Sequence, residues 1–155
     1  MKKVLFLSLC LLLTLLTSQA QYQIINGGFE DWEGSGDSRE PVRWNSFMTA
    51  TGSYASQVSA KQIEESSDIR PGSIGHSSIR TWARRFTVIV VTITANGMFT
   101  TGQVNAAAMS ASSTDNCNKT VIDNSNFNQP MIGKPDSLYF WAKAVFASSS
   151  QEARV

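Results

Sequence analysis

Two short clusters in the sequence combine aromatic rings with a cationic side chain at a spacing of two residues. Trp82 follows Arg80, and Trp141 lies between Tyr139 and Lys143. Side chains two positions apart on a β-strand emerge on the same face. An indole can stack on the C–H face of a pyranose while neighbouring polar groups bind the hydroxyls. These five residues are therefore candidate carbohydrate-binding residues, with packing in the core or across strands as the alternative role.

The stretch INGGFEDWEG, residues 25–34, carries a different chemistry. Asn26, Glu30 and Asp31 supply side-chain oxygens, and Ca²⁺ takes carboxylate and carbonyl oxygens. These residues are candidate ligands of a structural calcium ion, and no cofactor is required. Alternatively, the Asn-Gly-Gly sequence is a simple turn and Glu30 is a solvated or capping acid.

The sequence shows no clear group of catalytic residues. Glycoside hydrolysis needs two carboxylates in different protonation states, and no pair of acids stands out; Glu64 and Glu65 lie in a polar segment. The single histidine, His76, has no acid at a spacing typical of a Ser-His-Asp triad. Cys117 lies among Asp and Asn residues without a cationic activator. The sequence therefore favours binding over catalysis, and we assign no catalytic residue.

The elements that must position these residues are mainly strands. The clearest is RRFTVIVVTITANG, which is apolar on both faces and ends in Asn96-Gly97, a typical hairpin turn, with a returning strand expected over 98–104. A second strand is predicted over 136–146, where alternation places Leu138, Phe140 and Phe146 on the core face. Strand patterns thus surround both aromatic clusters.

Weaker patterns complete the chain. Further strands are expected at 22–25, around 42–48 and at 77–84. Residues 105–134 are rich in Ser, Asn and Thr and predict a long loop or insertion, a kind of segment that is often functional when ordered. The only short helix candidate, over 56–67, has no convincing apolar stripe, because Val58 and Ile63 do not form one. About six or seven strands result, fewer than the eight of a closed jelly roll.

The N-terminus predicts export. Lys2 and Lys3 precede an apolar run that ends in small residues, so residues 1–20 have the pattern of a secretory signal peptide, and the run is too short for a membrane span. The remainder, 21–155, suits one domain. Its scattered basic residues form no patch for nucleic acid. We expect a secreted, periplasmic or cell-surface protein without a membrane span after signal cleavage.

Several ordered blocks are similar to those of a known family. The blocks are RPGSIGHSSIRTWAR, ANGMFTTGQVNAAAMSA and FNQPMIGKPDSLYFWAK, preceded by INGGFEDW and PVRWNSF. The first three resemble the carbohydrate metabolism domain of secreted and surface proteins from gut-dwelling Gram-negative glycan degraders. The opening two resemble the start of bacterial jelly-roll carbohydrate-binding modules. The resemblance covers nearly all of residues 24–146 and implies a domain that continues past the strand predicted over 136–146.

This resemblance and the strand pattern together predict an all-β protein, an incomplete β-sandwich of jelly-roll, galactose-binding-like type. It implies a non-catalytic module that binds a polysaccharide or oligosaccharide. Trp32 and Trp44 lie where the resemblance places packing residues, which leaves Trp82 and Trp141 as the binding candidates. A glycoside hydrolase domain and a structural or adhesive domain without a sugar site are the alternatives.

Overall fold

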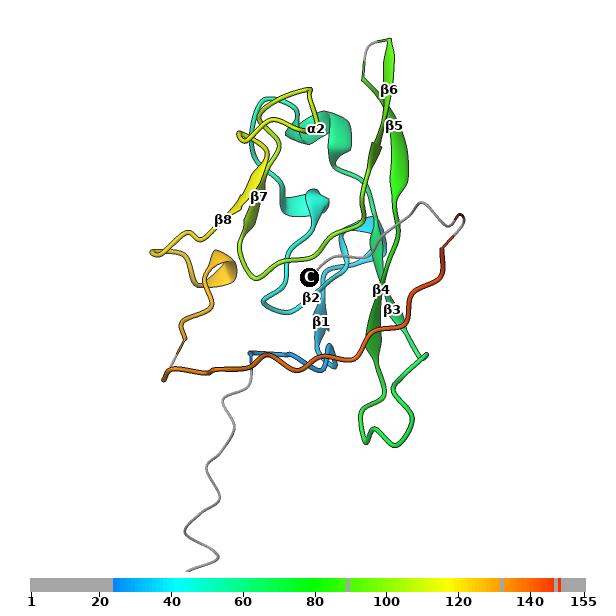
Figure 1. Ribbon diagram of the computed structural model, residues 1–155, viewed down its shortest axis with the longest axis vertical. Coiled ribbons are helices and arrows are strands. Elements are labelled where there is room, and N and C mark those ends of the chain that lie inside the picture. The colour runs from blue at the N-terminus through cyan, green and yellow to red at the C-terminus, as the bar shows by residue number, and fades with distance from the viewer. Residues whose placement is uncertain (1–23, 89, 132, 147, 149–155) are drawn as a thin grey trace, which may run out of the picture.

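Figure 1 shows the computed structural model, in which residues 24–88, 90–131, 133–146 and 148 are described. The predicted signal peptide over residues 1–20 lies outside this range.

Eight short strands form four antiparallel, two-stranded sheets within the described residues. The pairs are β1 (Trp32–Glu33) with β2 (Glu40–Pro41), β3 (Ile63–Ser66) with β4 (Ser78–Thr81), β5 (Arg84–Val88) with β6 (Val91–Ala95), and β7 (Gln103–Asn105) with β8 (Cys117–Lys119). The predicted all-β class is confirmed.

Helical structure is limited to single turns. These are α2 (Ala55–Val58) and the 3-10 turns η1 (Gly36–Ser38), η2 (Phe47–Thr49) and η3 (Ser125–Phe127). Among the described residues, no helix has the length and apolar character needed to cross a bilayer. In the segment 56–67, where the sequence shows no convincing helical stripe, only the first turn is helical and β3 lies near its end.

The core is small, and its members come from the middle of the chain, between residues 58 and 106. Its buried apolar side chains are those of Val58, Ile63, Phe86, Val104 and Ala106. A neighbouring aromatic cluster joins Phe29, Trp44 and Phe99, whose ring centroids lie 5.1 to 5.5 Å apart. Burial of so few apolar groups gives modest stabilisation, so close backbone contacts carry unusual weight in this fold.

Backbone bridges connect the middle of the chain to β7. Asn45 and Thr100 exchange hydrogen bonds of 2.7 and 2.9 Å, and the N–H of Thr51 donates to the Val104 carbonyl at 2.8 Å. These contacts replace the strand predicted around 42–48, where only an isolated bridge at Asn45 is found. The strand predicted at 77–84 is confirmed in its central part as β4.

The long apolar run after Arg84 folds differently from its prediction. Instead of one strand ending at Asn96-Gly97, it forms the β5–β6 hairpin, with Val88 and Val91 as the last register partners. Gly97 packs against the backbone of Trp82, where an added Cβ would lie 2.6 Å from the Trp82 nitrogen. The glycine therefore serves close packing, and the strand predicted over 98–104 contributes β7, which pairs with β8 rather than with β6.

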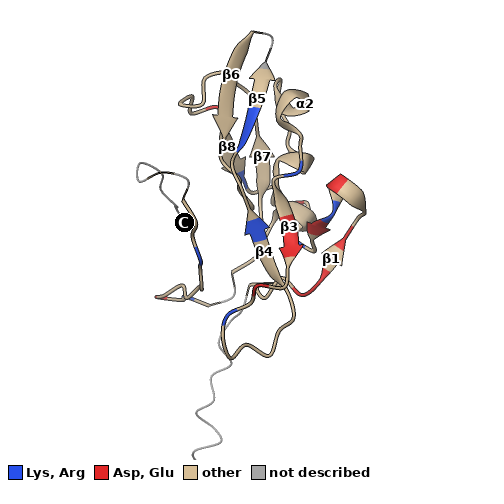
Figure 2. Ribbon diagram, turned by 90° about the vertical axis from the view of Figure 1, so that its right-hand side faces the viewer, with Lys and Arg blue, Asp and Glu red and all other residues tan. Residues whose placement is uncertain are grey.

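The strand predicted over 136–146 is also wrong as an element of a sheet. The segment has no ladder partner among the described residues, and Figure 2 shows the C-terminal ribbon standing apart from β3 and β4. Leu138, Phe140 and Phe146, expected in the core, are exposed. An alternating pattern predicts which side chains share one face of an extended segment. The segment becomes a β-strand of a sheet only where the backbone edge of another strand pairs with it.

Candidate functional site

A groove of about 390 Å³ beside the β3–β4 hairpin is the candidate binding site. Separate segments line it with Trp32, Arg39, Lys61, Glu64, Glu65 and His76. Its volume lies within the range of about 300 to 1,000 Å³ that is usual for small-ligand sites. In Figure 2, acidic residues of β1, β2 and β3 lie near the basic residue of β4 on this side of the molecule. The groove thus combines an aromatic ring with both signs of charge.

Trp32 is held in place by its neighbours. It pairs with Pro41 across the β1–β2 sheet, and its indole Nε1 donates to the Phe29 carbonyl at 2.7 Å. The guanidinium carbon of Arg39 lies 5.7 Å from the ring centroid, a cation–π contact. The half-buried ring is therefore oriented by a hydrogen bond and a stacked cation while part of it lines the groove.

The two carboxylates of β3 are each paired. Glu65 Oε2 lies 2.6 Å from Arg39 Nη2, and Glu65 Oε1 accepts a hydrogen bond of 2.9 Å from the Ser77 hydroxyl. Glu64 binds Arg80, its register partner on β4, at 2.9 Å. Partly exposed ion pairs add little stability. Their main effect here is to fix where the groove presents its carboxylates.

The position of His76 depends on Glu30. The Glu30 carboxylate accepts the backbone N–H groups of His76 at 2.9 Å and Ser77 at 3.3 Å. An added Cβ at Gly75 would lie 3.1 Å from the Glu30 carboxyl carbon, so the glycine leaves room for this contact. The opening segment is thereby tied to the loop before β4, and His76 lines the groove.

Two basic side chains of the groove have no partner in the described part of the chain. The Lys61 ammonium and the His76 imidazole make no hydrogen bond or ion pair there. The backbone at both positions is held: the Lys61 carbonyl accepts from Arg84 at 3.5 Å, and His76 is fixed through Glu30. Both groups are therefore available to a ligand.

The cluster predicted around Trp82 lies on the hairpin that borders the groove. Arg80 is exposed and engaged by Glu64. Trp82 follows β4 and is half-buried; its backbone N–H donates to the Gln62 carbonyl at 3.1 Å, and its carbonyl accepts the Gln62 amide at 3.2 Å. The backbone of Trp82 thus serves the junction between β3 and β5, and only its neighbour Arg80 contacts a groove residue.

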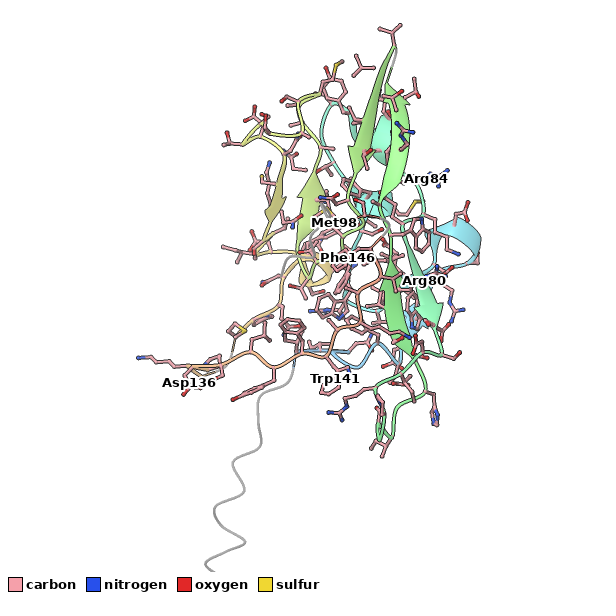
Figure 3. All side chains as sticks on the ribbon, turned by 45° about the vertical axis from the view of Figure 1, so that its right-hand side comes forward. Arg80, Arg84, Met98, Asp136, Trp141 and Phe146 are labelled. Atoms are coloured by element: carbon pink, nitrogen blue, oxygen red, sulfur yellow. The ribbon has the colours of Figure 1, made fainter. Side chains whose placement is uncertain are left out.

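The cluster predicted around Trp141 lies elsewhere. Tyr139 and Trp141 are 83 % and 72 % exposed, Lys143 binds Asp68 at 2.6 Å, and the Arg70 guanidinium lies 5.9 Å from the Trp141 ring. Figure 3 shows Trp141 well apart from Arg80. The two predicted clusters therefore do not form one site.

Two of the three side chains of the predicted calcium site, those of Asn26 and Glu30, have protein partners, and Asp31 is exposed. Asn26 Nδ2 donates to the carbonyls of Asp31 and Val42 at 2.8 and 3.0 Å, and Asn26 Oδ1 accepts the Asp31 N–H at 3.1 Å. Glu30 binds the backbone before β4. Within the described residues, no three His, Cys, Asp or Glu side chains gather as metal ligands. The arrangement fits a hydrogen-bonded turn, and calcium binding stays a prediction.

A second groove, of about 320 Å³, contains a buried acid. Glu40 is only 7 % exposed, and its Oε1 accepts the Ser46 N–H at 2.8 Å and also the Ser46 hydroxyl. Burial raises the pKa of the Glu40 carboxyl; the Ser46 hydrogen bonds oppose the rise and the nearby Glu33 charge adds to it. Glu33 is the register partner of Glu40 and lines the same groove.

Part of the loop predicted over 105–134 forms a wall of this second groove. Asn126 and Phe127 line it, and the Asn126 carbonyl accepts the Asn45 side-chain amide at 2.7 Å. The Arg43 guanidinium donates to the Asn128 carbonyl at 3.1 Å. The loop is thus docked on the turn after β2 by hydrogen bonds to its backbone.

Sequence reasoning missed the combination of Trp32, Arg39 and Lys61. These residues come from separate segments, and their meeting depends on the β1–β2 register and on the contact of β2 with β3. No periodic sequence pattern predicts a contact between separate segments. The role of the groove therefore depends on the chemistry of the residues that line it. Comparison of the chain with models of protein families, with curated proteins and with solved structures gives no match.

Proposed function

We propose that this chain is a glycan-binding module of the β-sandwich, jelly-roll type that holds a polysaccharide or oligosaccharide without catalysis. The observation that carries the proposal is the groove in which the oriented indole of Trp32 lies among hydrogen-bonding side chains. A secretory signal over residues 1–20 would deliver the module to the periplasm, the cell surface or the medium.

The groove offers the two contacts that sugars need. The indole of Trp32 provides an apolar surface for the C–H face of a pyranose. Lys61 and His76 provide donors without a protein partner in the described residues, and Glu64 and Glu65 provide oriented acceptors. A purely structural domain predicts that every tryptophan is buried, whereas Trp141 is 72 % exposed.

Isothermal titration against a panel of plant and host glycans tests the proposal. We expect a saccharide that binds the wild-type chain and loses about 10-fold or more in affinity with Trp32→Ala, which corresponds to about 1.4 kcal/mol. Trp141→Ala is the matched control, because this indole is exposed and lies outside the groove. Circular dichroism of both variants reports whether the fold persists.

The outcome separates three cases. Loss of binding with Trp32→Ala alone supports the groove, whereas loss with Trp141→Ala alone moves the sugar site to the C-terminal segment. No binding by the folded wild-type chain to any glycan of the panel contradicts a glycan-binding function.

The second groove favours one further candidate, a glycoside hydrolase. Such enzymes use one protonated and one ionised carboxyl group on either side of the bond. Glu40 is buried with a raised pKa, and Glu33 is exposed and faces it across the β1–β2 pair. In this scheme Glu40 donates a proton to the leaving oxygen, and Glu33 attacks the sugar or activates water. Release of reducing sugar that Glu40→Gln and Glu33→Gln each abolish supports this candidate.

A further inference from the structure

The segment over residues 136–146 has the composition of a strand without the pairing of one. No backbone hydrogen bond within the described residues involves it. Its large apolar side chains are strongly exposed, with Val145 at 89 %, and they include Leu138, Tyr139, Phe140, Trp141 and Phe146. Exposed apolar groups in one contiguous run mark an interaction surface. The unpaired backbone groups point to a partner that is itself a strand.

Two contacts fix this segment against the rest of the molecule. Lys143 binds Asp68 at 2.6 Å, and Arg70 stacks 5.9 Å from the Trp141 ring. Both partners belong to the loop between β3 and β4. The segment is thus held in an extended form along the outside of the molecule (Figure 1), which reduces the entropy lost when another strand pairs with it.

The sequence of the segment is self-complementary in an antiparallel register centred on Ala142. In this register Leu138 faces Phe146 and Phe140 faces Ala144, so apolar side chains meet apolar ones. Trp141 of one copy then faces Lys143 of the other, which places an ammonium beside an indole. The segment carries one basic residue and one acidic residue, Lys143 and Asp136. Asp136 lies at its end, so the central register brings no like charges into opposition.

We propose that residues 138–146 pair with the same segment of a second copy of this chain, forming a symmetric antiparallel two-stranded ribbon. A two-fold axis through Ala142 makes both halves of the interface equivalent, as in most homodimers. The ribbon satisfies the unpaired backbone groups and covers part of the exposed apolar surface. Its small size makes the dimer dissociate on dilution.

Disulfide trapping tests the register directly. The free and exposed Cys117 is first replaced by serine. Ala142→Cys in this background places two thiols opposite each other at the two-fold axis, where Cα atoms of opposed residues lie about 4.5 to 5.5 Å apart, within the reach of a disulfide. Ala144→Cys is the matched control, since its two copies lie four residues out of register, roughly 13 Å apart along the strand.

Mild oxidation should give a covalent dimer with Ala142→Cys and little or none with Ala144→Cys. In sedimentation, the wild-type chain should form a dimer whose fraction rises with concentration. Equal crosslinking of both variants would show random collision and overturn the register. A wild-type chain that sediments as a monomer at high concentration, with no crosslinking of Ala142→Cys, would show that the segment takes another partner and would overturn the proposal.

Discussion

Replacing Gly97 by alanine tests the contact that joins the two central hairpins. Gly97 follows β6 and packs on the backbone of Trp82, which follows β4. An added Cβ would lie 2.6 Å from the Trp82 nitrogen, and closer still to the Trp82 carbonyl oxygen and the Thr81 hydroxyl. Two of these three atoms belong to the backbone, so a change of rotamer cannot relieve the overlap. The two segments must separate by about 1 Å to restore normal contact distances.

The cost follows from what this separation disrupts. Overpacking of a tight site costs about 1 to 3 kcal/mol. The fully buried Gln62 amide spans the same junction, donating to the carbonyls of Trp82 and Ala95 at 3.2 and 3.0 Å. Loss of one of these bonds leaves a buried carbonyl unpaired and adds about 1 to 3 kcal/mol. Alanine restricts the unfolded chain and returns about 0.4 to 1 kcal/mol. The expected loss is about 1 to 6 kcal/mol.

Urea unfolding monitored by tryptophan fluorescence measures this loss. A domain with a small core has a free energy of unfolding near the low end of about 5 to 15 kcal/mol, so Gly97→Ala should unfold at a clearly lower urea concentration than the wild type, and a loss at the upper end of the range would leave it largely unfolded without urea. Gly28→Ala is the control, because its Cβ would meet Glu30 Cγ at an ordinary 3.6 Å. If both variants unfold at the same urea concentration as the wild type, Gly97 does not pack on Trp82 and the junction described above is wrong.

The remaining predictions concern charge and metal. Burial raises the pKa of Glu40, so ionisation costs folding free energy once the pH passes the ordinary glutamate value of about 4.3. Glu40→Gln keeps the acceptor for Ser46 without the charge, and its Tm relative to the wild type should rise between about pH 4 and pH 7; a constant difference argues against the raised pKa. EDTA should leave the Tm unchanged, because Asn26 and Glu30 are engaged by protein groups; a fall reversed by Ca²⁺ would instead support the predicted calcium site.

The class of the fold could be predicted from the sequence, but the pairing of its strands could not. Alternation identified the apolar run from Phe86 to Ile93 as strand. It could not show that the run reverses between Val88 and Val91, because no glycine, proline or asparagine marks the turn there. The only obvious turn signal, Asn96-Gly97, is used for close approach to Trp82 instead. An Asn-Gly pair indicates that the backbone can turn tightly or approach another segment closely. Tertiary packing determines which of the two occurs.

The candidate site was less predictable than the fold, for a related reason. The rule that residues two apart share a face grouped Trp82 with Arg80 and Trp141 with Lys143. Arg80 is instead engaged across the sheet by Glu64, and Lys143 is engaged by the distant Asp68. The groove is built from contacts between segments, as in the pairing of Glu30 with the backbone of His76. Such contacts follow from register and docking, which a single sequence does not encode locally.

Stability and binding share one junction in this molecule. Lys61 and Glu64, which line the groove, flank the buried pair Gln62 and Ile63. Gln62 is in turn the residue that ties Trp82 to Ala95. A change that separates the two hairpins therefore moves the strand that forms one wall of the groove. If the groove binds a saccharide as proposed, its affinity should fall in partly destabilised variants before the chain unfolds, because its wall depends on backbone contacts rather than on a large apolar core.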